Sequence, residues 1–288
     1  MVRTWTRADA ARALRRPTAD DDKYSRGVLG MRTGSEAYPG AAVLGVEAAW
    51  RTGLGMVRYL GPDRPTALVL ARRPETVTAD GRVQAWVIGS GTDASARTPS
   101  DTAALRALLS DTDPVVVDAG ALDLAAEATA PRILTPHDRE HARLRTALGL
   151  GHTPADRVAA ARETAEATGA VVLLKGAVTV VVAPDGWAAT VEAGTPWLAT
   201  AGTGDVLAGV IGALVAAAMA QEGRTDAATL AALAASGAWL HGRAAAIAAQ
   251  GASIAGAASS PPFGDGPITA LDVAEALPRA VAEALARA

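Results

Sequence analysis

Short apolar runs rich in Val and Ile alternate with longer helical patterns along most of the chain. Gly, Pro and Asp bound the short runs, as is typical of strands, and the longer segments carry apolar residues at helical spacing or are rich in Ala. We expect strands at residues 55–60, 67–71, 85–91, 113–122, 132–137, 170–176, 178–186 and 187–194, and helices near 38–53, 101–110, 138–148, 155–168, 205–221, 226–250 and 270–287.

This alternation predicts an α/β protein whose mostly parallel sheet is covered by helices on both faces. No internal repeat is visible, and no linker separates two domains. We interpret residues 1–22 as a polar, poorly ordered N-terminal arm and residues 23–288 as a single domain. The segment 259–267 is rich in Pro and Gly and is expected to be a surface loop.

Polar or glycine residues end several of the strand-like runs. Gly89 and Gly91 end one run, and Asp118, His137 and Lys175 each end another. Ligands of open parallel sheets bind beyond the carboxyl ends of the strands. The sequence therefore predicts that these residues lie along one active-site rim.

The stretch "TAGTGDVLAG" (200–209) places Asp205 between a Gly-Thr-Gly turn and a long apolar helix. Asp205 could cap that helix. However, the N–H groups of Gly202, Thr203 and Gly204, with the helix N-terminus behind them, form an anion site. A carboxylate beside an anion site suits a general base that takes a proton from a hydroxyl while a phosphate occupies the N–H groups. We predict that Asp205 is this base and that Gly202–Gly204 form the anion hole.

Two further strand-end residues have open interpretations. Asp118 could cap the next turn, or it could reach a phosphate-bound Mg²⁺ through water. Lys175 could be a solvated surface lysine, or it could contact a phosphate together with Gly176, with the Thr179 hydroxyl nearby. No metal ligand is assigned.

The remaining candidates are histidines and a segment of small residues. His137 is more often structural in such a setting, and His141, four residues on, completes no metal-binding pattern. "GSEAYPGAA" (34–42) indicates either tight packing or the close approach of a flat ring to the backbone. Neither a G-x-G-x-x-G nor a P-loop motif is present.

Composition narrows the classes of function. Half of the residues are hydrophobic but only 3% are aromatic, which favours closely packed, Ala-rich helices. The net charge of −3 without a basic block argues against nucleic acid as a partner. The absence of cysteine excludes disulfides and thiolate chemistry.

The apolar run 206–220 is too short for a membrane span and predicts a buried core helix. With no signal-peptide pattern, we expect a cytoplasmic protein without a membrane partner.

Seven segments occur in an order that resembles the ADP-dependent NAD(P)H-hydrate dehydratases of the ribokinase-like superfamily. They are "KYSRG" (23–27), "GSEAYPGAAVLG" (34–45), "VIGSGT" (87–92), "VVDAGAL" (116–122), "ILTPHDRE" (133–140), "LLKGAVTVV" (173–181) and "TAGTGDVLAGVIGAL" (200–214). The G-T-G-D motif alone indicates only the superfamily. The combination of "YPGAA", "TPH..E" and "KG..T" is much more specific, and the resemblance covers nearly the whole chain.

The resemblance implies a ribokinase-like three-layer α/β/α sandwich and a lyase that repairs nicotinamide nucleotides. Such an enzyme removes water from the S epimer of hydrated NADH or NADPH (NADHX or NADPHX), uses ADP as co-substrate with Mg²⁺, and releases AMP and phosphate. By the same resemblance, the substrate site comprises Ala41, Gly91, His137 and Asp205, with His137 orienting the hydrated ring. The nucleotide site comprises Lys175, Gly176, Ala177, Val178, Thr179 and Gly204.

The resemblance also implies partners. Family members are often fused to an epimerase domain, and because only 22 residues precede the matched region we expect a stand-alone dehydratase served by a separate epimerase. Relatives are tetrameric, which implies a homotetramer. Preference for ADP over ATP, or for NADHX over NADPHX, does not follow from the residues.

The sequence departs from the family pattern in two places. Asp138 and Arg139 stand where small residues are common, and Ser90 stands where proline is common. Two alternatives stay open: a ribokinase-like kinase of a vitamin-precursor alcohol, which would leave a stable phosphate ester, and a non-catalytic nucleotide-binding protein on the same fold.

Overall fold

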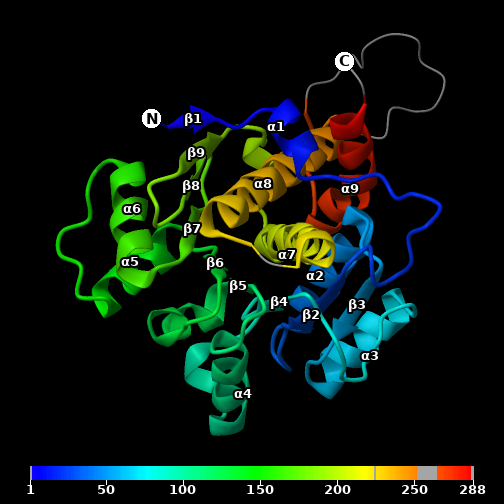
Figure 1. Cartoon of the computed structure of the whole chain (residues 1–288), viewed down its shortest axis with the longest axis horizontal. Helices are drawn as coiled ribbons and strands as arrows, with labels where there is room; N and C mark the ends of the chain where they lie inside the picture. Colours follow the sequence, from blue (N-terminus) through cyan, green and yellow to red (C-terminus); the bar gives the residue numbers. More distant parts are fainter. Residues whose placement is uncertain (1, 224, 252–264, 287–288) are drawn as a thin grey trace.

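A single nine-stranded sheet forms the centre of the molecule (Figure 1). The computed structural model describes residues 2–223, 225–251 and 265–286. The strand order is β1-β9-β8-β7-β6-β5-β4-β2-β3, and β8 is antiparallel to both of its neighbours while all other pairs are parallel. This confirms the predicted mostly parallel sheet. The strands are β1 (Arg3–Thr4), β2 (Val28–Arg32), β3 (Met56–Tyr59), β4 (Ala85–Ile88), β5 (Val115–Val117), β6 (Arg132–Leu134), β7 (Val171–Leu174), β8 (Thr179–Val182) and β9 (Ala188–Val191).

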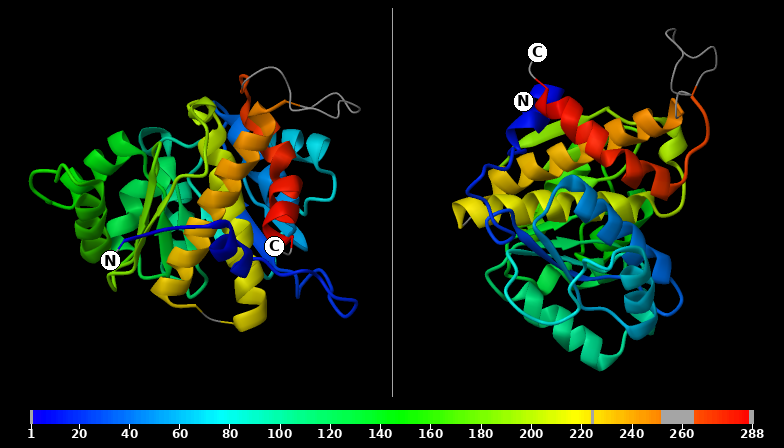
Figure 2. Two further views of the ribbon diagram at one scale, coloured as in Figure 1. Left: turned by 90° about the horizontal axis from the view of Figure 1, so that it is seen from above. Right: turned by 90° about the vertical axis from the view of Figure 1, so that its right-hand side faces the viewer.

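Helices cover both faces of the sheet, which completes the three layers (Figure 2). One layer holds α2 (Pro39–Thr52), α7 (Thr203–Glu222), α8 (Ala227–Ala249) and α9 (Ala270–Leu285), with α1 (Arg7–Arg12) packed on α8 and α9. The other holds α4 (Pro99–Leu109), α5 (Asp138–Ala147), α6 (Arg157–Thr168) and the 3₁₀ segment η2 (Ala119–Glu127), while α3 (Asp63–Arg72) packs on α2. Two short 3₁₀ turns, η1 (Ala94–Ala96) and η3 (Pro196–Leu198), lie in loops.

The helix α7 is the core helix that the sequence predicts. Although long and apolar enough to span a membrane, it has 67% of its most apolar 18-residue window buried inside the protein. Its small residues permit close helix packing: a Cβ added at Gly209 would lie 2.3 Å from the carbonyl oxygen of Gly45 on α2. Helices α2 and α7, which carry candidate site residues, are therefore held in direct backbone contact.

The expected strand at 67–71 is wrong, because these residues belong to α3. A short apolar run does not by itself distinguish a strand from a helix. Here Asp63 lies in the first turn and Pro65 and Val69, spaced by four, form the buried face, whereas Leu68 and Leu70 are exposed. Conversely, β2 was not expected as a strand, and it pairs with both β3 and β4.

The expectation of a poorly ordered N-terminal arm is wrong for its first part. Strand β1 pairs with β9, and Trp5 is buried, with its indole Nε1 donating to Ser236 Oγ at 3.1 Å. Thr6 and Asp9 form a capping box at the start of α1. The predicted surface loop 259–267 lies largely outside the described residues, which resume at 265.

Candidate functional site

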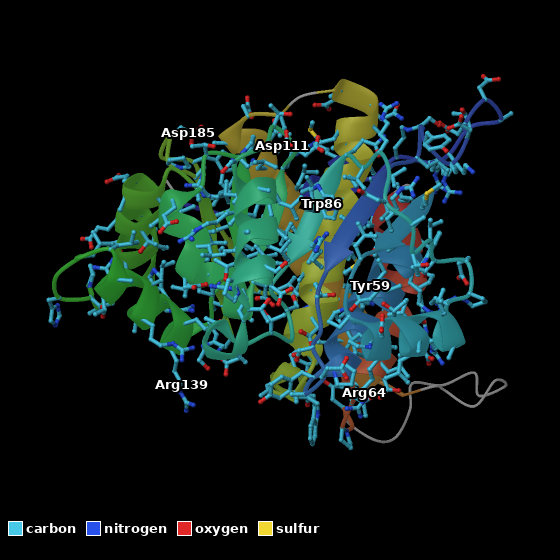
Figure 3. All side chains as sticks on the ribbon, turned by 90° about the horizontal axis from the view of Figure 1, so that it is seen from below. Tyr59, Arg64, Trp86, Asp111, Arg139 and Asp185 are labelled. Atoms are coloured by element: carbon cyan, nitrogen blue, oxygen red, sulfur yellow. The ribbon has the colours of Figure 1, made fainter. Side chains whose placement is uncertain are left out.

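The carboxyl ends of β4, β5, β6 and β7 meet at one edge of the sheet, because these four strands are adjacent and parallel. In Figure 3, Arg64 and Arg139, which follow the carboxyl ends of β3 and β6, lie at this edge, and Asp111, which precedes β5, lies at the opposite edge. The predicted position of the residues that follow these four strands along one edge is therefore confirmed, and their role as an active site stays a prediction.

Asp118, directly after β5, is the centre of a hydrogen-bond network. Its Oδ2 accepts from Ser90 Oγ at 2.8 Å, and its Oδ1 accepts from Thr135 Oγ1 at 2.8 Å and from Lys175 Nζ at 3.0 Å. Its side chain makes no capping hydrogen bond to the following η2 segment. The capping interpretation is thus wrong, and both carboxylate oxygens are engaged in joining β4, β6 and β7 to β5.

Lys175 is a largely buried cation rather than a surface lysine. Its side chain is 19% exposed and lies 3.0 Å from Asp118 Oδ1 and 3.7 Å from Glu140 Oε2. Burial disfavours its charged form, but the carboxylates of Asp118 and Glu140 outweigh this and raise the pKa of Lys175. The site therefore keeps a fixed positive charge at neutral pH.

Asp205 lies in the first turn of α7 and does not cap the helix. The N-cap is Gly202, in the left-handed region with φ of 90°, and no side chain makes a capping bond there. Burial, together with the nearby negative charge of Asp118, raises the pKa of Asp205 to about 7, against the opposing charge of Lys175. A carboxyl group that titrates near neutral pH is suited to general-base catalysis.

The N-terminus of α7 leaves backbone N–H groups for an anion. The first hydrogen bond of the helix runs from Val206 N to Gly202 O at 3.2 Å, and Thr203 N donates to Thr200 O at 3.4 Å. Of the predicted anion hole Gly202–Gly204, Thr203 N is thus engaged, whereas the N–H of Gly204, like that of Asp205 beside it, is one that a helix start leaves without an intrahelical partner. A Cβ at Gly204 would lie 3.6 Å from Lys175 Nζ. The lysine charge and these N–H groups are therefore close to each other.

Ala41 and Gly91 lie together beside the first turn of α7. Gly91 has a φ of 65°, and a Cβ there would lie only 2.2 Å from Ala41 Cβ. Ala41 is one helical turn before Gly45, and a Cβ at Gly45 would lie 3.4 Å from the main-chain oxygen of Asp205. Small residues therefore bring α2 and the turn at Gly91 close to the main chain of Asp205, and we call this the Ala41–Gly91 side.

A cavity of about 900 Å³ lies on the other side of the α7 N-terminus. Its volume is in the range of small-molecule and cofactor sites. It is lined by His137, Asp138, Lys175, Gly176, Ala177, Thr179, Val191, Ala193, Gly194, Thr195, Pro196, Leu198, Ala199, Thr200, Thr203, Gly204, Leu207, Ala238, His241 and Gly242.

The two predicted sets of residues thus fall largely on two sides of the same helix start. Lys175, Gly176, Ala177, Thr179 and Gly204 line the cavity. Val178 is the exception in the nucleotide set, because its side chain is exposed and does not line the cavity. Of the substrate set, Ala41, Gly91 and Asp205 do not line it, whereas His137 does.

His137 has the structural role that the sequence left open. Its Nδ1 accepts from the N–H groups of Arg139 at 3.2 Å and Glu140 at 3.3 Å, and Glu140 Oε2 accepts from His137 N at 2.9 Å, which forms a cap for α5. His141 is buried, with Nε2 2.8 Å from Thr164 Oγ1. The described residues contain no cluster of three or more potential metal ligands.

Arg157, on α6, is a site residue that sequence reasoning missed. It donates to the main-chain oxygens of Val178 at 2.6 Å and Lys175 at 2.8 Å, and to Asp138 Oδ1 at 3.0 Å. A Cβ at Gly176 would lie 2.7 Å from its Nη2, so the glycine leaves room for the guanidinium. Arg157 therefore fixes the turn between β7 and β8, and no local pattern in the sequence indicates it.

Both departures from the family pattern have structural partners. Asp138 pairs with Arg157, and Ser90 donates to Asp118. The neighbouring Arg139 extends away from the fold (Figure 3). Neither departure removes a group from the edge of the sheet where the candidate residues gather.

Together, the fold and the site define an α/β protein of the ribokinase-like class, with a helix start whose free N–H groups suit an anion. A family model described as NAD(P)H-hydrate dehydratase matches residues 29–260. The chain belongs to this NAD(P)H-hydrate dehydratase family.

Individual relatives agree with this assignment. The chain is 47% identical over 225 residues to the bifunctional NAD(P)H-hydrate repair enzyme Nnr of Mycobacterium leprae, covering 74% of this chain and 46% of that protein. It is 38% identical over 218 residues to the ADP-dependent (S)-NAD(P)H-hydrate dehydratase of Neisseria meningitidis, covering 68% and 72%. The match thus spans under half of the length of the bifunctional relative.

A solved structure supports the fold over nearly the whole chain. The ADP/ATP-dependent NAD(P)H-hydrate dehydratase of Bacillus subtilis, co-crystallized with ATP and Mg²⁺, superposes with a TM-score of 0.79 at 28% identity, covering 98% of this chain and 99% of that one. The predicted ribokinase-like sandwich is confirmed.

Proposed function

We propose that this protein removes water from the S epimer of hydrated NADH and NADPH at the expense of ADP, and releases NAD(P)H, AMP and phosphate. The observation that carries the proposal is the position of Asp205. Its carboxyl group, with a pKa of about 7, belongs to a helix start that has the Ala41–Gly91 side on one flank and the cavity lined by Lys175 and Gly204 on the other. The name of the Neisseria meningitidis relative supports the S epimer and ADP.

The proposed chemistry begins with phosphoryl transfer. The hydroxyl on the hydrated ring is a poor leaving group, so Asp205 takes its proton while the hydroxyl oxygen attacks the β-phosphorus of ADP, and AMP leaves. The N–H groups at the start of α7 and the charge of Lys175 stabilise the transferring phosphoryl group. The phosphate ester then eliminates inorganic phosphate, assisted by the ring nitrogen, with loss of a ring proton to restore the double bond.

The nucleotide is proposed to occupy the cavity with its phosphates toward Lys175 and Gly204. The turn from Gly176 to Thr179, which Arg157 fixes, forms one wall. His137 caps α5 through Nδ1, so we propose that it orients the hydrated ring rather than transferring its proton.

Mg²⁺ fits this site if the nucleotide phosphates supply most of its ligands. Both oxygens of Asp118 already accept hydrogen bonds, and the described residues offer no three-ligand cluster. Mg²⁺ is commonly bound by one or two carboxylates together with phosphates and waters, and Glu140 beside Lys175 is the carboxylate best placed to help. The ion would neutralise charge on the phosphates.

The test is the return of dihydronicotinamide absorbance when purified protein, Mg²⁺ and ADP are added to chemically prepared hydrated NADH, with AMP and phosphate measured in parallel. A rise that requires nucleotide supports the proposal, and repetition with ATP and with hydrated NADPH defines the preferences. No rise from a protein that binds nucleotide would overturn it. A stable phosphate ester from an alcohol substrate would instead support the vitamin-precursor kinase.

Further proposals concern partners and location. We propose that a separate epimerase converts the R epimer to the S epimer, that the protein is a homotetramer, and that it is cytoplasmic without a nucleic-acid or membrane partner. The name of the Neisseria meningitidis relative supports the separate epimerase, and the net charge of −3 supports the absence of a nucleic-acid partner. Conversion of the pure R epimer by this protein alone would contradict the first, and sedimentation tests the tetramer.

A further inference from the structure

His241 lies in the wall of the cavity, on the helix α8. It is 8% exposed and shares the wall with Ala238 and Gly242 on the same helix. A Cβ at Gly242 would lie 2.8 Å from Gly194 N, so α8 passes close to the loop after β9. The imidazole Nε2 is buried and has no hydrogen-bond partner among the described residues.

The threonine hydroxyls of the same wall are already engaged locally. Thr195 Oγ1 accepts from Trp197 N at 3.4 Å, and Thr200 Oγ1 donates to Trp197 O at 2.8 Å. Thr203 Oγ1 lies 2.9 Å from Thr200 O, to which it donates. Within the described part of the chain, each of these hydroxyls makes a hydrogen bond, whereas the buried Nε2 of His241 makes none. A buried polar atom without a partner calls for a bound ligand or water.

The charge state of His241 suits a neutral ligand group. Burial is the main cause of a lowered pKa of the imidazole; a backbone hydrogen bond with Thr203 opposes it, the charge of Lys175 adds to it, and the resulting pKa is about 4. At neutral pH the ring is therefore uncharged, with one N–H donor and one nitrogen acceptor. Lys175 is the charged group that acts on it across the cavity.

The apolar walls indicate which part of a nucleotide reaches His241. The phosphates are proposed to lie at Lys175 and Gly204, whereas Val191, Ala193, Leu198 and Leu207 form the apolar lining. An apolar lining with a few polar groups suits a base or a ribose rather than a phosphate.

We propose that His241 contacts the nucleoside part of the bound nucleoside diphosphate through a hydrogen bond at its free imidazole Nε2. This inference rests on the proposed function only in that ADP is the ligand of this cavity. If the protein binds ADP but does not dehydrate hydrated NADH or NADPH, the inference about His241 still stands.

The first experiment compares ADP binding by calorimetry for the wild type, His241→Phe and His241→Gln. Loss of a hydrogen bond that leaves polar groups unpaired costs roughly tenfold in affinity, so the Phe variant should bind ADP about tenfold more weakly. The Gln variant, which keeps a donor and an acceptor, should recover most of this. KM for ADP should rise more than kcat falls. A Phe variant with the wild-type affinity overturns the inference.

The matched control is His141→Gln. His141 is also buried and also has a pKa lowered to about 4, but its Nε2 is already bonded to Thr164 and it does not line the cavity. ADP affinity should not change in this variant. An equal loss there would show that removal of any buried imidazole weakens binding, and would overturn the specific role of His241.

A second measurement uses the wild-type protein, so it does not depend on whether a His241 variant folds. The chain has four histidines, so imidazole carbon-labelled wild-type protein gives four resolvable ring signals. ADP should shift the His241 signal while leaving that of His141 in place. A His241 signal that does not move at saturating ADP overturns the inference. A shift without any dehydration would retain the inference and remove the proposed function.

Discussion

Lys175 Nζ lies 3.0 Å from Asp118 Oδ1, which joins the carboxyl ends of β7 and β5 by an ion pair. Burial is the main cause of the raised pKa of Asp205, and this pair modifies it, because the Asp118 charge raises that pKa further and the Lys175 charge lowers it. The carboxylate of Asp118 is thus paired with Lys175, and the carboxyl group of Asp205 is the one that titrates near neutral pH.

Asp118→Asn should move the pH profile of the reaction. Without the charge of Asp118, the pKa of Asp205 falls, so the midpoint at which kcat/KM rises should shift from about 7 to a lower pH, with a lower maximal rate. Steady-state rates across the pH range give this midpoint. Ser90→Ala is the control, because it removes a hydrogen bond to Asp118 and keeps the charge. An unshifted midpoint in Asp118→Asn would show that Asp205 does not control the profile.

Asp205→Asn should stabilise the protein at alkaline pH. The folded-state pKa of about 7 is above the ordinary value of 3.8. Stability from the protonated carboxyl is therefore fully present below about pH 4 and is lost as pH rises through about 7. The gain in Tm of the variant should be larger at about pH 8 than at about pH 4.5. Equal gains at both pH values would contradict the raised pKa.

Glu47 supports α2 through a buried ion network. Burial alone would raise the pKa of Glu47, but hydrogen bonds from Arg73, Arg51 and Arg72 outweigh it and hold the pKa at about 2. Glu47→Gln should lower the free energy of unfolding in urea by about 1–3 kcal/mol near neutral pH. Because the folded pKa is below its ordinary value of 4.5, this stabilisation is present above about pH 4.5 and is lost toward about pH 2.

The control for Glu47 is Glu75→Gln. Glu75 also pairs with Arg73, at 3.3 Å, but its side chain is 42% exposed. Exposed ion pairs contribute little, so this variant should unfold like the wild type. Similar losses in both variants would mean that burial is not what makes Glu47 important.

Gly209→Ala should weaken both stability and turnover. The added methyl would lie 2.3 Å from Gly45 O and push α2 away from α7. Overpacking of this kind costs about 1–3 kcal/mol, and it moves Ala41 relative to Asp205. Urea unfolding and turnover together check it. Gly151→Ala, which meets no atom within 4 Å, is the control and should change neither. A Gly209→Ala protein with normal stability would contradict the close packing of the two helices.

The sequence predicts the sheet and the rim well, because strand ends and helix starts carry local signals. Asp118, His137 and Lys175 each end an apolar run, and parallel pairing brings such ends together. The same local signals fail at residues 67–71, where only tertiary burial on one helical face shows that the run is part of α3.

The partners of the site residues could not be predicted. Arg157 holds the β7–β8 turn from a helix that precedes β7, and Ser90 and Thr135 reach Asp118 from two other strand ends. His241 enters the cavity from α8. These contacts depend on the spatial order of the strands and helices, which no spacing in the sequence encodes.

The central claim is that Asp205 is the general base of an ADP-dependent dehydration. The most direct measurement compares wild type and Asp205→Asn for nucleotide-dependent return of dihydronicotinamide absorbance, with ADP affinity measured on the same samples. Asp205→Asn should lose turnover by roughly 10²–10⁴-fold, the contribution of a general base, with ADP affinity largely kept. An Asp205→Asn enzyme that turns over near the wild-type rate would contradict it.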